Sequence, residues 1–342
     1  MLTENWTGRE PKSLAIVGLS KNAGKTTVLN HLSEWAASRS LPAGLISIGV
    51  DGEERDALSG LPKPQVLVPK GTLVASAGPC LDVRAGLWEV LEETPVRSLL
   101  GRVFLARAVR RGRVKLAGIT AAGDVDRVLM GFRRHGVRLA LVDGACDRRT
   151  AARPLRTDGV ILAVGASAGK SLEEVIRRTE EWVTIFNLPA CGDPLLEEAG
   201  ERALLEGRPM GIVGKRVEPF PLPSLLVDPG KLRTALESRP WTGLAVPGAL
   251  TDRILMLLAS GGGFFPLLLP SPTHAFFSPG TMRTFLRAGG KICYLKRPRL
   301  IGVAVNPVAP GSHTFDPREM KRRIADICRP VPVVDVVRDG IG

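Results

Sequence analysis

The residues best suited to chemistry in this chain lie in one short stretch, LAIVGLSKNAGKTT, at positions 14–27. An apolar run ends at Gly18, a polar loop follows, and the run Gly24–Thr27 opens a helix-forming sequence. Free backbone N–H groups at the start of a helix, with a lysine beside them, form a site for phosphate groups. The usual loop of this kind has four residues between its first glycine and the Gly-Lys pair. Here there are five, but the strand–loop–helix context still favours a phosphate-binding loop and not an ordinary turn.

The loop residues have separate expected roles. Lys25 would reach the terminal phosphates as a point charge, and the Thr26 hydroxyl would bind Mg²⁺. Gly24 has no side chain, so its backbone can approach a phosphate closely. The residues expected to contact a nucleotide are Gly18, Ser20, Lys21, Asn22, Ala23, Gly24, Lys25, Thr26 and Thr27.

Two aspartates could complete a metal site. Asp143 ends the apolar run LALVD, and Asp51 ends the run ISIGVD. In open α/β sheets, ligands collect at the carboxyl ends of the strands. We expect Asp143 to hold Mg²⁺ through water and Asp51 to lie near the attacking water or the metal. Lys25, Asp51 and Asp143 are thus the candidate catalytic residues, although an aspartate at a strand end can also be a simple cap.

The residue that contacts the base is expected on a late strand. No NKxD sequence, which would indicate Ras-like guanine specificity, occurs in the chain. Asn306 ends the apolar run RLIGVAVN and is the candidate contact to adenine, which favours ATP as the ligand. The alternative is that Asn306 and the following proline only turn the chain.

Other residues that could do chemistry form no recognisable site. The histidines have no shared spacing that would predict a metal cluster, and they are His31, His135, His274 and His313. The five cysteines have no metal-ligand spacing and are odd in number, which favours reduced thiols in a cytosolic protein. A second GKS sequence, at 169–171, is interpreted as a turn because Ser171 and Glu174 form a capping box there.

The elements that would position these residues alternate between strand and helix. The apolar runs lack period-two alternation, which is typical of strands in a parallel sheet covered on both faces. The sequence therefore predicts an α/β fold with a mostly parallel, doubly wound sheet. The expected strands in the first half are 14–18, 43–50, 65–69, 102–109, 114–119, 137–144 and 158–166. The expected helices there are 26–39, 81–91, 124–135 and 171–186.

In the second half of the sequence, the alternation of expected strands and helices is interrupted. Residues 189–240 contain eight prolines and are interpreted as a connector with one small helix. Strand–helix alternation then resumes, with strands at 243–246, 266–269, 291–295, 299–306 and 332–337 and helices from Thr251, from Pro279 and at 317–328. We expect a nucleotide-binding core at 1–188, a Pro-rich connector and α/β insertion at 189–298, and a return to the core at 299–342.

Charge and hydropathy limit the classes of partner that this chain could have. The formal net charge is +13, which invites an interpretation as a nucleic-acid binder. The arginines are dispersed, however, and no aromatic residues interleave with them as a platform for stacking bases, so nucleic acid stays an open but less favoured partner. The N-terminus lacks an apolar signal core, and no apolar stretch is long enough to cross a membrane. We expect a cytoplasmic protein without a membrane partner.

Two resemblances make the expectations more specific. The loop resembles that of the dethiobiotin synthetase and cobyrinic acid amidase branch of the SIMIBI class of P-loop NTPases, written GTxxxxGKT in that branch. Lys21 lies one residue short of the place of the signature lysine in MinD-like relatives, so the resemblance gives no support to lysine chemistry across a dimer. The stretches SKNAGKTT, SIGVDGE, VPKGTLVASA, VDGACDRRTA and VPGALTD resemble the smaller subunit of the lysine aminomutase reactivases.

The reactivase resemblance implies a Mg²⁺-dependent ATPase that helps to release damaged cobalamin from an adenosylcobalamin-dependent aminomutase. The implied partners are a companion MutS-like ATPase subunit and the aminomutase holoenzyme, and ATP hydrolysis would be slow or stimulated by those partners. The cofactors would be ATP and Mg²⁺. Two alternatives stay open: a stand-alone ATP-dependent ligase similar to dethiobiotin synthetase, and an NTPase associated with nucleic acid.

Overall fold

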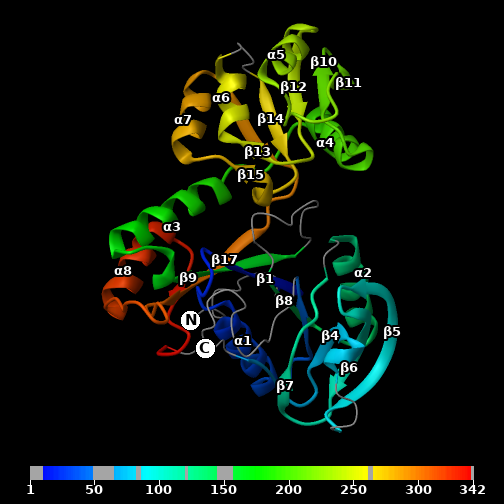
Figure 1. Cartoon of the computed structure of the whole chain (residues 1–342), viewed down its shortest axis with the longest axis vertical. Helices are drawn as coiled ribbons and strands as arrows, with labels where there is room; N and C mark the ends of the chain where they lie inside the picture. Colours follow the sequence, from blue (N-terminus) through cyan, green and yellow to red (C-terminus); the bar gives the residue numbers. More distant parts are fainter. Residues whose placement is uncertain are drawn as a thin grey trace. The chain divides into compact units, whose positions relative to one another are not determined.

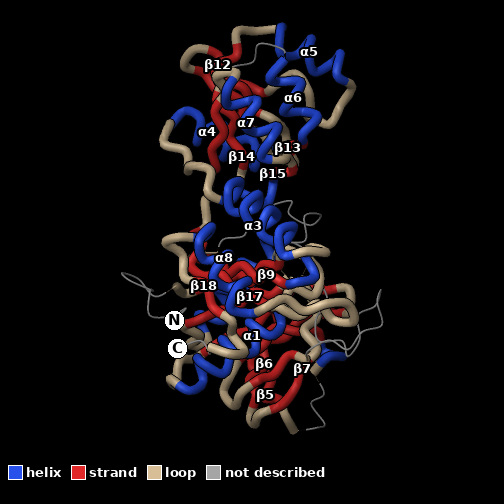
Figure 2. Tube along the Cα trace, turned by 90° about the vertical axis from the view of Figure 1, so that its left-hand side faces the viewer, coloured by secondary structure: helices blue, strands red, loops and turns tan. Residues whose placement is uncertain are grey.

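The computed structural model describes residues 11–48, 65–81, 86–119, 122–144, 157–260 and 265–339 (Figure 1). The chain divides into two compact units. The first comprises 1–147, 155–180 and 298–342, and the second comprises 148–154 and 181–297. Both units combine helices with strands (Figure 2). The division falls inside helix α3 (Leu172–Phe186), before the expected end of the core at 188.

The first unit is built on a nine-stranded sheet in the order β18-β17-β9-β1-β8-β2-β4-β6-β5. Every neighbouring pair is parallel except the β4–β6 and β5–β6 pairs, which are antiparallel. The strands are β1 (Ser13–Gly18), β2 (Ala43–Ser47), β4 (Leu73–Ala77), β5 (Trp88–Ser98), β6 (Gly101–Ala108), β8 (Leu139–Asp143), β9 (Gly159–Gly165), β17 (Arg299–Asn306) and β18 (Val333–Val334). The expected α/β fold with a large, mostly parallel sheet is therefore confirmed.

Helices cover both faces of this sheet. Helix α1 (Lys25–Ser38) packs on one face, where Leu45 of β2 belongs to the same buried cluster. The adjacent residue Gly44 points to the other face, where a Cβ on it would lie 2.7 Å from Phe132 of helix α2 (Ala122–Arg134). Because successive strand residues point to opposite faces, α1 and α2 lie on opposite sides. Helix α8 (Pro317–Cys328) packs against β17 and β18.

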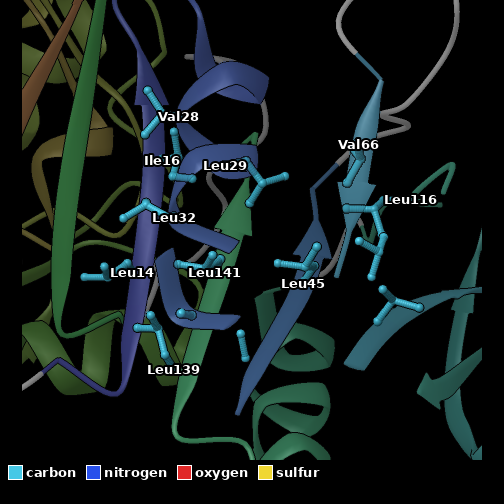
Figure 3. Packing of buried hydrophobic residues seen from close by; sticks show 14 of the residues in the cluster. Leu14, Ile16, Val28, Leu29, Leu32, Leu45, Val66, Leu116, Leu139 and Leu141 are labelled. Atoms are coloured by element: carbon cyan, nitrogen blue, oxygen red, sulfur yellow. The ribbon is translucent and has the colours of Figure 1, made fainter. Parts of the chain in front are cut away.

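The core between α1 and the sheet fixes the position of the loop that joins them. The buried residues of α1 recur at helical spacing, and those of β1 and β8 at strand spacing. Figure 3 shows this layer, in which Leu14, Ile16, Leu139 and Leu141 of the strands face Val28, Leu29 and Leu32 of α1. A separate ribbon of two short strands, β3 (Val66–Val68) and β7 (Gly112–Val114), adds Val66 to the same cluster.

The second unit is a smaller α/β unit with its own core. Its five-stranded sheet has the order β11-β10-β12-β14-β16, from β10 (Met210–Val213), β11 (Arg216–Pro219), β12 (Trp241–Ala245), β14 (Pro266–Leu269) and β16 (Lys291–Tyr294). Its helices are α4 (Pro194–Glu206), α5 (Pro229–Glu237), α6 (Asp252–Ser260) and α7 (Pro279–Arg287). Strands β13 (Leu250–Thr251) and β15 (Ala275–Phe276) pair in parallel as a separate two-stranded sheet.

The interpretation of 189–240 as a connector was wrong. This range holds α4, β10, β11 and α5. Two of its eight prolines begin helices instead of interrupting them: Pro194 follows the N-cap Asp193, and Pro229 follows the N-cap Asp228. Proline suits the first helical position because its fixed φ is helical and its missing N–H would have no partner there.

Two other element predictions also failed. The helix expected at 81–91 is contradicted by β5, which begins at Trp88 and pairs with β6 as an antiparallel edge strand. Its apolar residues happen to fit helical spacing, but cross-strand pairing decided the structure. The strand expected at 114–119 is limited to β7, which ends at Val114. The predicted strand at 43–50 was expected to lead into Asp51, but residues 49–51 lie outside the described residues.

Candidate functional site

The loop between β1 and α1 is closely folded at both of its glycines. A Cβ on Gly18 would lie 2.9 Å from the Ser20 carbonyl oxygen and 3.1 Å from Lys25 Nζ. The Lys25 side chain therefore folds back across the start of the loop. Gly24 has a φ of 101° and Asn22 a φ of 57°, both in the left-handed region. The backbone thus needs glycine at position 24, where any other residue would be strained.

Within the part of the chain that the structure describes, no side-chain oxygen caps the N-terminus of α1. Its N-cap is Gly24, which makes no side-chain cap, and its first turn contains no acidic residue. Five other helices instead have a side-chain oxygen at this place, from Ser171, Asp193, Asp228, Ser278 and Asp316. The first N–H groups of a helix have no intrahelical acceptor and carry partial positive charge. The start of α1, with Lys25 beside it, is therefore suited to an anion.

Strand β9 and the residues directly after it hold the loop in place from one side. Leu19 donates its N–H to Ala163 of β9 at 2.9 Å. A Cβ on Gly165 at the end of β9 would lie 2.5 Å from the Cα atom of Ala23, so only glycine fits there. Beyond β9, Ser167 lies against the loop, and its Oγ is 2.8 Å from the Lys21 carbonyl oxygen and 3.0 Å from Ser20 Oγ.

Asn306 lies against the same loop. A Cβ on Gly24 would be 3.3 Å from Asn306 Cβ and 3.4 Å from Asn306 Nδ2. The side-chain oxygen of Asn306 accepts from the Val308 N–H at 3.2 Å, so this residue also turns the chain after β17. Asn306 therefore packs on the loop itself, next to the start of α1. Its contact with adenine stays a prediction, and the structure adds a second role in supporting Gly24.

Asp143 ends the strand directly beside β1. It pairs with Ile16 of β1 and Ser47 of β2, and its side chain is fully buried. Asp143 Oδ1 accepts from the Gly144 N–H at 2.8 Å. Because Leu139, Leu141 and Asp143 alternate along β8, the carboxylate lies on the sheet face that α1 covers. Thr26, in the first turn of α1, is also buried on that side.

The structure thus brings most of the sequence-predicted residues together at the carboxyl edge of one sheet. These are the loop from Gly18 to Gly24, the helix start Lys25, Thr26 and Thr27, and Asn306 and Asp143 at strand ends. Lys21 is exposed, and its carbonyl group faces Ser167. Asp51 lies outside the described residues, so the part of the metal site assigned to it stays a prediction.

Two contributors were missed at the level of sequence. Gly165 and Ser167 belong to the second GKS-containing stretch, which was interpreted only as a turn. That interpretation is confirmed, because Ser171 Oγ accepts from the Glu174 N–H at 3.2 Å and α3 begins at Leu172. The available signal was Gly165 at the end of β9, which matches Gly18 at the end of β1. A glycine at such a place indicates that another backbone segment, here that of Ala23, comes close to it.

Residues elsewhere form no competing metal site. Among the described residues, no group of three or more histidines, cysteines or acidic residues could hold a metal ion. His274 is buried in the second unit, and that burial lowers its pKa to about 4, which keeps it neutral at pH 7. Among the described residues, Cys80, Cys191, Cys293 and Cys328 form no disulfide.

Comparisons of the chain with protein-family models, with curated proteins and with solved structures found no match. No helix within the described ranges is both long and apolar enough to cross a membrane. What supports a function is therefore the geometry of the site and the residue types in it.

Proposed function

We propose that this protein is a Mg²⁺-dependent P-loop NTPase that binds ATP at the loop between β1 and α1. The observation that carries the proposal is the uncapped start of α1, with Lys25 folded across Gly18 beside it. Backbone N–H groups, a lysine and a glycine without a Cβ are the features that a polyphosphate requires. A phosphate would draw the Lys25 ammonium group away from Gly18 and onto its oxygens.

The neighbouring strand supports the metal part of the proposal. Thr26 and Asp143 lie on the same side of the sheet at its carboxyl edge, where oxygen ligands for Mg²⁺ are needed. Mg²⁺ would supply charge neutralisation at the β- and γ-phosphates. Thr26 would hold it directly, and Asp143 would hold its water ligands. The base assignment to adenine rests on Asn306 and on the missing NKxD sequence, and competition between ATP and GTP decides it.

We further propose the narrower role of a reactivase subunit for an adenosylcobalamin-dependent aminomutase. This role is supported by the resemblance of the short stretches given above. The second unit has its own buried core, and we propose that its surface contacts the partner. In this role, nucleotide-dependent change at the sheet edge would be coupled to the conformation of the partner.

The nucleotide proposal is tested by thermal unfolding with and without ATP and Mg²⁺. At a free ligand concentration of about 100 times Kd, binding stabilises the folded state by about 2.7 kcal/mol. We expect the melting temperature to rise for the wild type and for Lys170→Ala, but not for Lys25→Ala. Lys170 is a matched control because it is the exposed lysine of the second GKS sequence. Equal stabilisation of the Lys25 variant would place the phosphates elsewhere.

A further inference from the structure

A cavity of about 440 Å³ lies at the other end of the strands that carry the phosphate loop and Asp143. It is lined by residues at the start of β1, at the start of β8 and at the C-terminal end of α2. A six-residue strand such as β1 rises about 17 Å, so this cavity is separate from the loop at the carboxyl edge. Its volume falls within the usual range for small-molecule sites.

The floor of the cavity is apolar and well supported. Leu129 and Phe132 of α2 and Val137 before β8 are all buried. Phe132 packs closely on β2, since a Cβ on Gly44 would lie 2.7 Å from its ring. The Val137 N–H donates to the Phe132 carbonyl oxygen at 2.9 Å, which fixes the turn from α2 into β8. The floor therefore offers a preformed surface to an apolar or aromatic group.

The rim of the cavity is basic. Lys12, Arg133 and Arg138 are exposed, and among the described residues none of the three forms an ion pair. Other arginines of the same unit do have carboxylate partners, for example Arg127 with Asp124 and Arg134 with Glu92. Three cations around one cavity, without internal partners there, form a positive potential that favours an anion.

The nearest negative groups reduce this potential but do not cancel it. Asp158 Oδ2 is engaged by the Lys12 N–H, the Ser13 N–H and the Ser13 hydroxyl at 2.8–3.1 Å. The C-terminus of α2 adds about half a negative charge, and Arg133 lies in its last turn. Three full positive charges outweigh these two contributions.

We propose that this cavity binds a small amphipathic anion. Its apolar or aromatic body would lie on Leu129 and Val137, above the fully buried Phe132, and its phosphate or pair of carboxylates would lie against Lys12, Arg133 and Arg138. Arginine suits both groups because its planar guanidinium donates two parallel hydrogen bonds to phosphate or carboxylate oxygens. We expect such a ligand to need both halves, because one small group alone supplies only part of the binding free energy.

The test is a calorimetric titration with two probes of this chemistry, phenyl phosphate and benzylsuccinate. We expect at least one to bind with a Kd below about 1 mM, and the stronger of the two identifies the charged group. Inorganic phosphate and phenol, which each carry one half of the chemistry, should bind at least about tenfold more weakly. Absence of binding by both probes up to about 10 mM would overturn the proposal.

Variants separate this site from the phosphate loop. Arg133→Gln combined with Arg138→Gln should weaken binding of the better probe by about tenfold or more, because two of the three charged partners, including both guanidinium groups, are lost. Arg233→Gln with Arg287→Gln removes the same charge from exposed positions of the second unit and should leave binding unchanged. Lys25→Ala should also leave it unchanged. Affinity that survives the first double variant, or that depends on Lys25, contradicts the proposed site.

Discussion

Under the proposed function, Asp143 is the described carboxylate that would give the site nucleotide turnover in addition to phosphate binding. It is fully buried, it ends the strand next to β1, and it lies on the face that α1 covers. A carboxylate removed from water requires compensation by hydrogen bonds or by a cation. The Gly144 N–H supplies one such hydrogen bond. Mg²⁺ with its waters is the compensation that the proposed chemistry adds.

We expect Asp143→Asn to remove the Mg²⁺ dependence of ATP binding and to reduce hydrolysis by about 100-fold, or about 2.7 kcal/mol. The fold should persist, because the substitution removes a buried charge and keeps the side-chain shape. Titration of ATP at varied Mg²⁺ concentration, together with phosphate release, measures both effects. Asp326→Asn, on the exposed side of α8, is the control with the same chemical change. Full magnesium-dependent turnover by the Asp143 variant would exclude this carboxylate from the metal site.

At the scale of elements, the contact between β9 and the loop from β1 to α1 holds that loop in place. The backbone of Ala23 approaches Gly165 so closely that a Cβ would meet the Ala23 Cα atom at 2.5 Å. The loop position therefore depends on a strand that contributes no phosphate contact itself. Backbone atoms cannot move aside as the end of a flexible side chain can, so the loop as a whole must shift if this space is filled.

We expect Gly165→Ala to destabilise the protein by about 1–3 kcal/mol, the usual cost of overpacking. It should also weaken ATP binding, because the shifted loop no longer directs its N–H groups at one point. Gly192→Ala is the matched control, since a Cβ there has no neighbour within 4 Å. Chemical unfolding and an ATP titration of both variants measure the two effects. Normal ATP affinity in Gly165→Ala would show that β9 does not position the loop.

The elements of the site were readable from the sequence because their signals are local. β1, β8 and β9 are continuous buried runs, and α8 has its cap and helical period in adjacent residues. The packing of Gly165 and Asn306 on the loop could not be predicted, because it depends on which strands become neighbours. The edge strand β5 and the proline-opened helices α4 and α5 were obscured for related reasons. Cross-strand pairing and helix position, instead of residue type, decide such cases.

At the scale of the whole molecule, the net charge of +13 does not by itself indicate nucleic acid as the partner. Several exposed arginines of the first unit lie beside carboxylates, as Arg107 does beside Glu89 and Arg134 beside Glu92. Such pairs are typical of a solvated surface, and each contributes little to stability. The proposed function points instead to a protein partner that responds to whether ATP is bound at the site.

The reactivase role predicts slow ATP turnover by the isolated chain and faster turnover with its partners. A switch that hydrolyses ATP without a client would waste it, and charge stabilisation at the γ-phosphate is often supplied in trans. We expect Asp51→Asn to reduce the stimulated rate more than ATP affinity. Phosphate release is measured with and without the companion ATPase subunit and the aminomutase. Fast turnover that partners leave unchanged would favour the ligase-like function.

The central claim is that the phosphates of ATP bind at the start of α1, and hydrogen–deuterium exchange measures this most directly. The first N–H groups of a helix lack intrahelical acceptors, so they exchange readily until a ligand engages them. On addition of ATP and Mg²⁺, residues 18–27 should become protected in the wild type and in Lys170→Ala. In Lys25→Ala this protection should be lost, and residues 279–287 of α7 should remain unchanged in all three proteins. Protection that appears elsewhere while residues 18–27 exchange as before would contradict the claim.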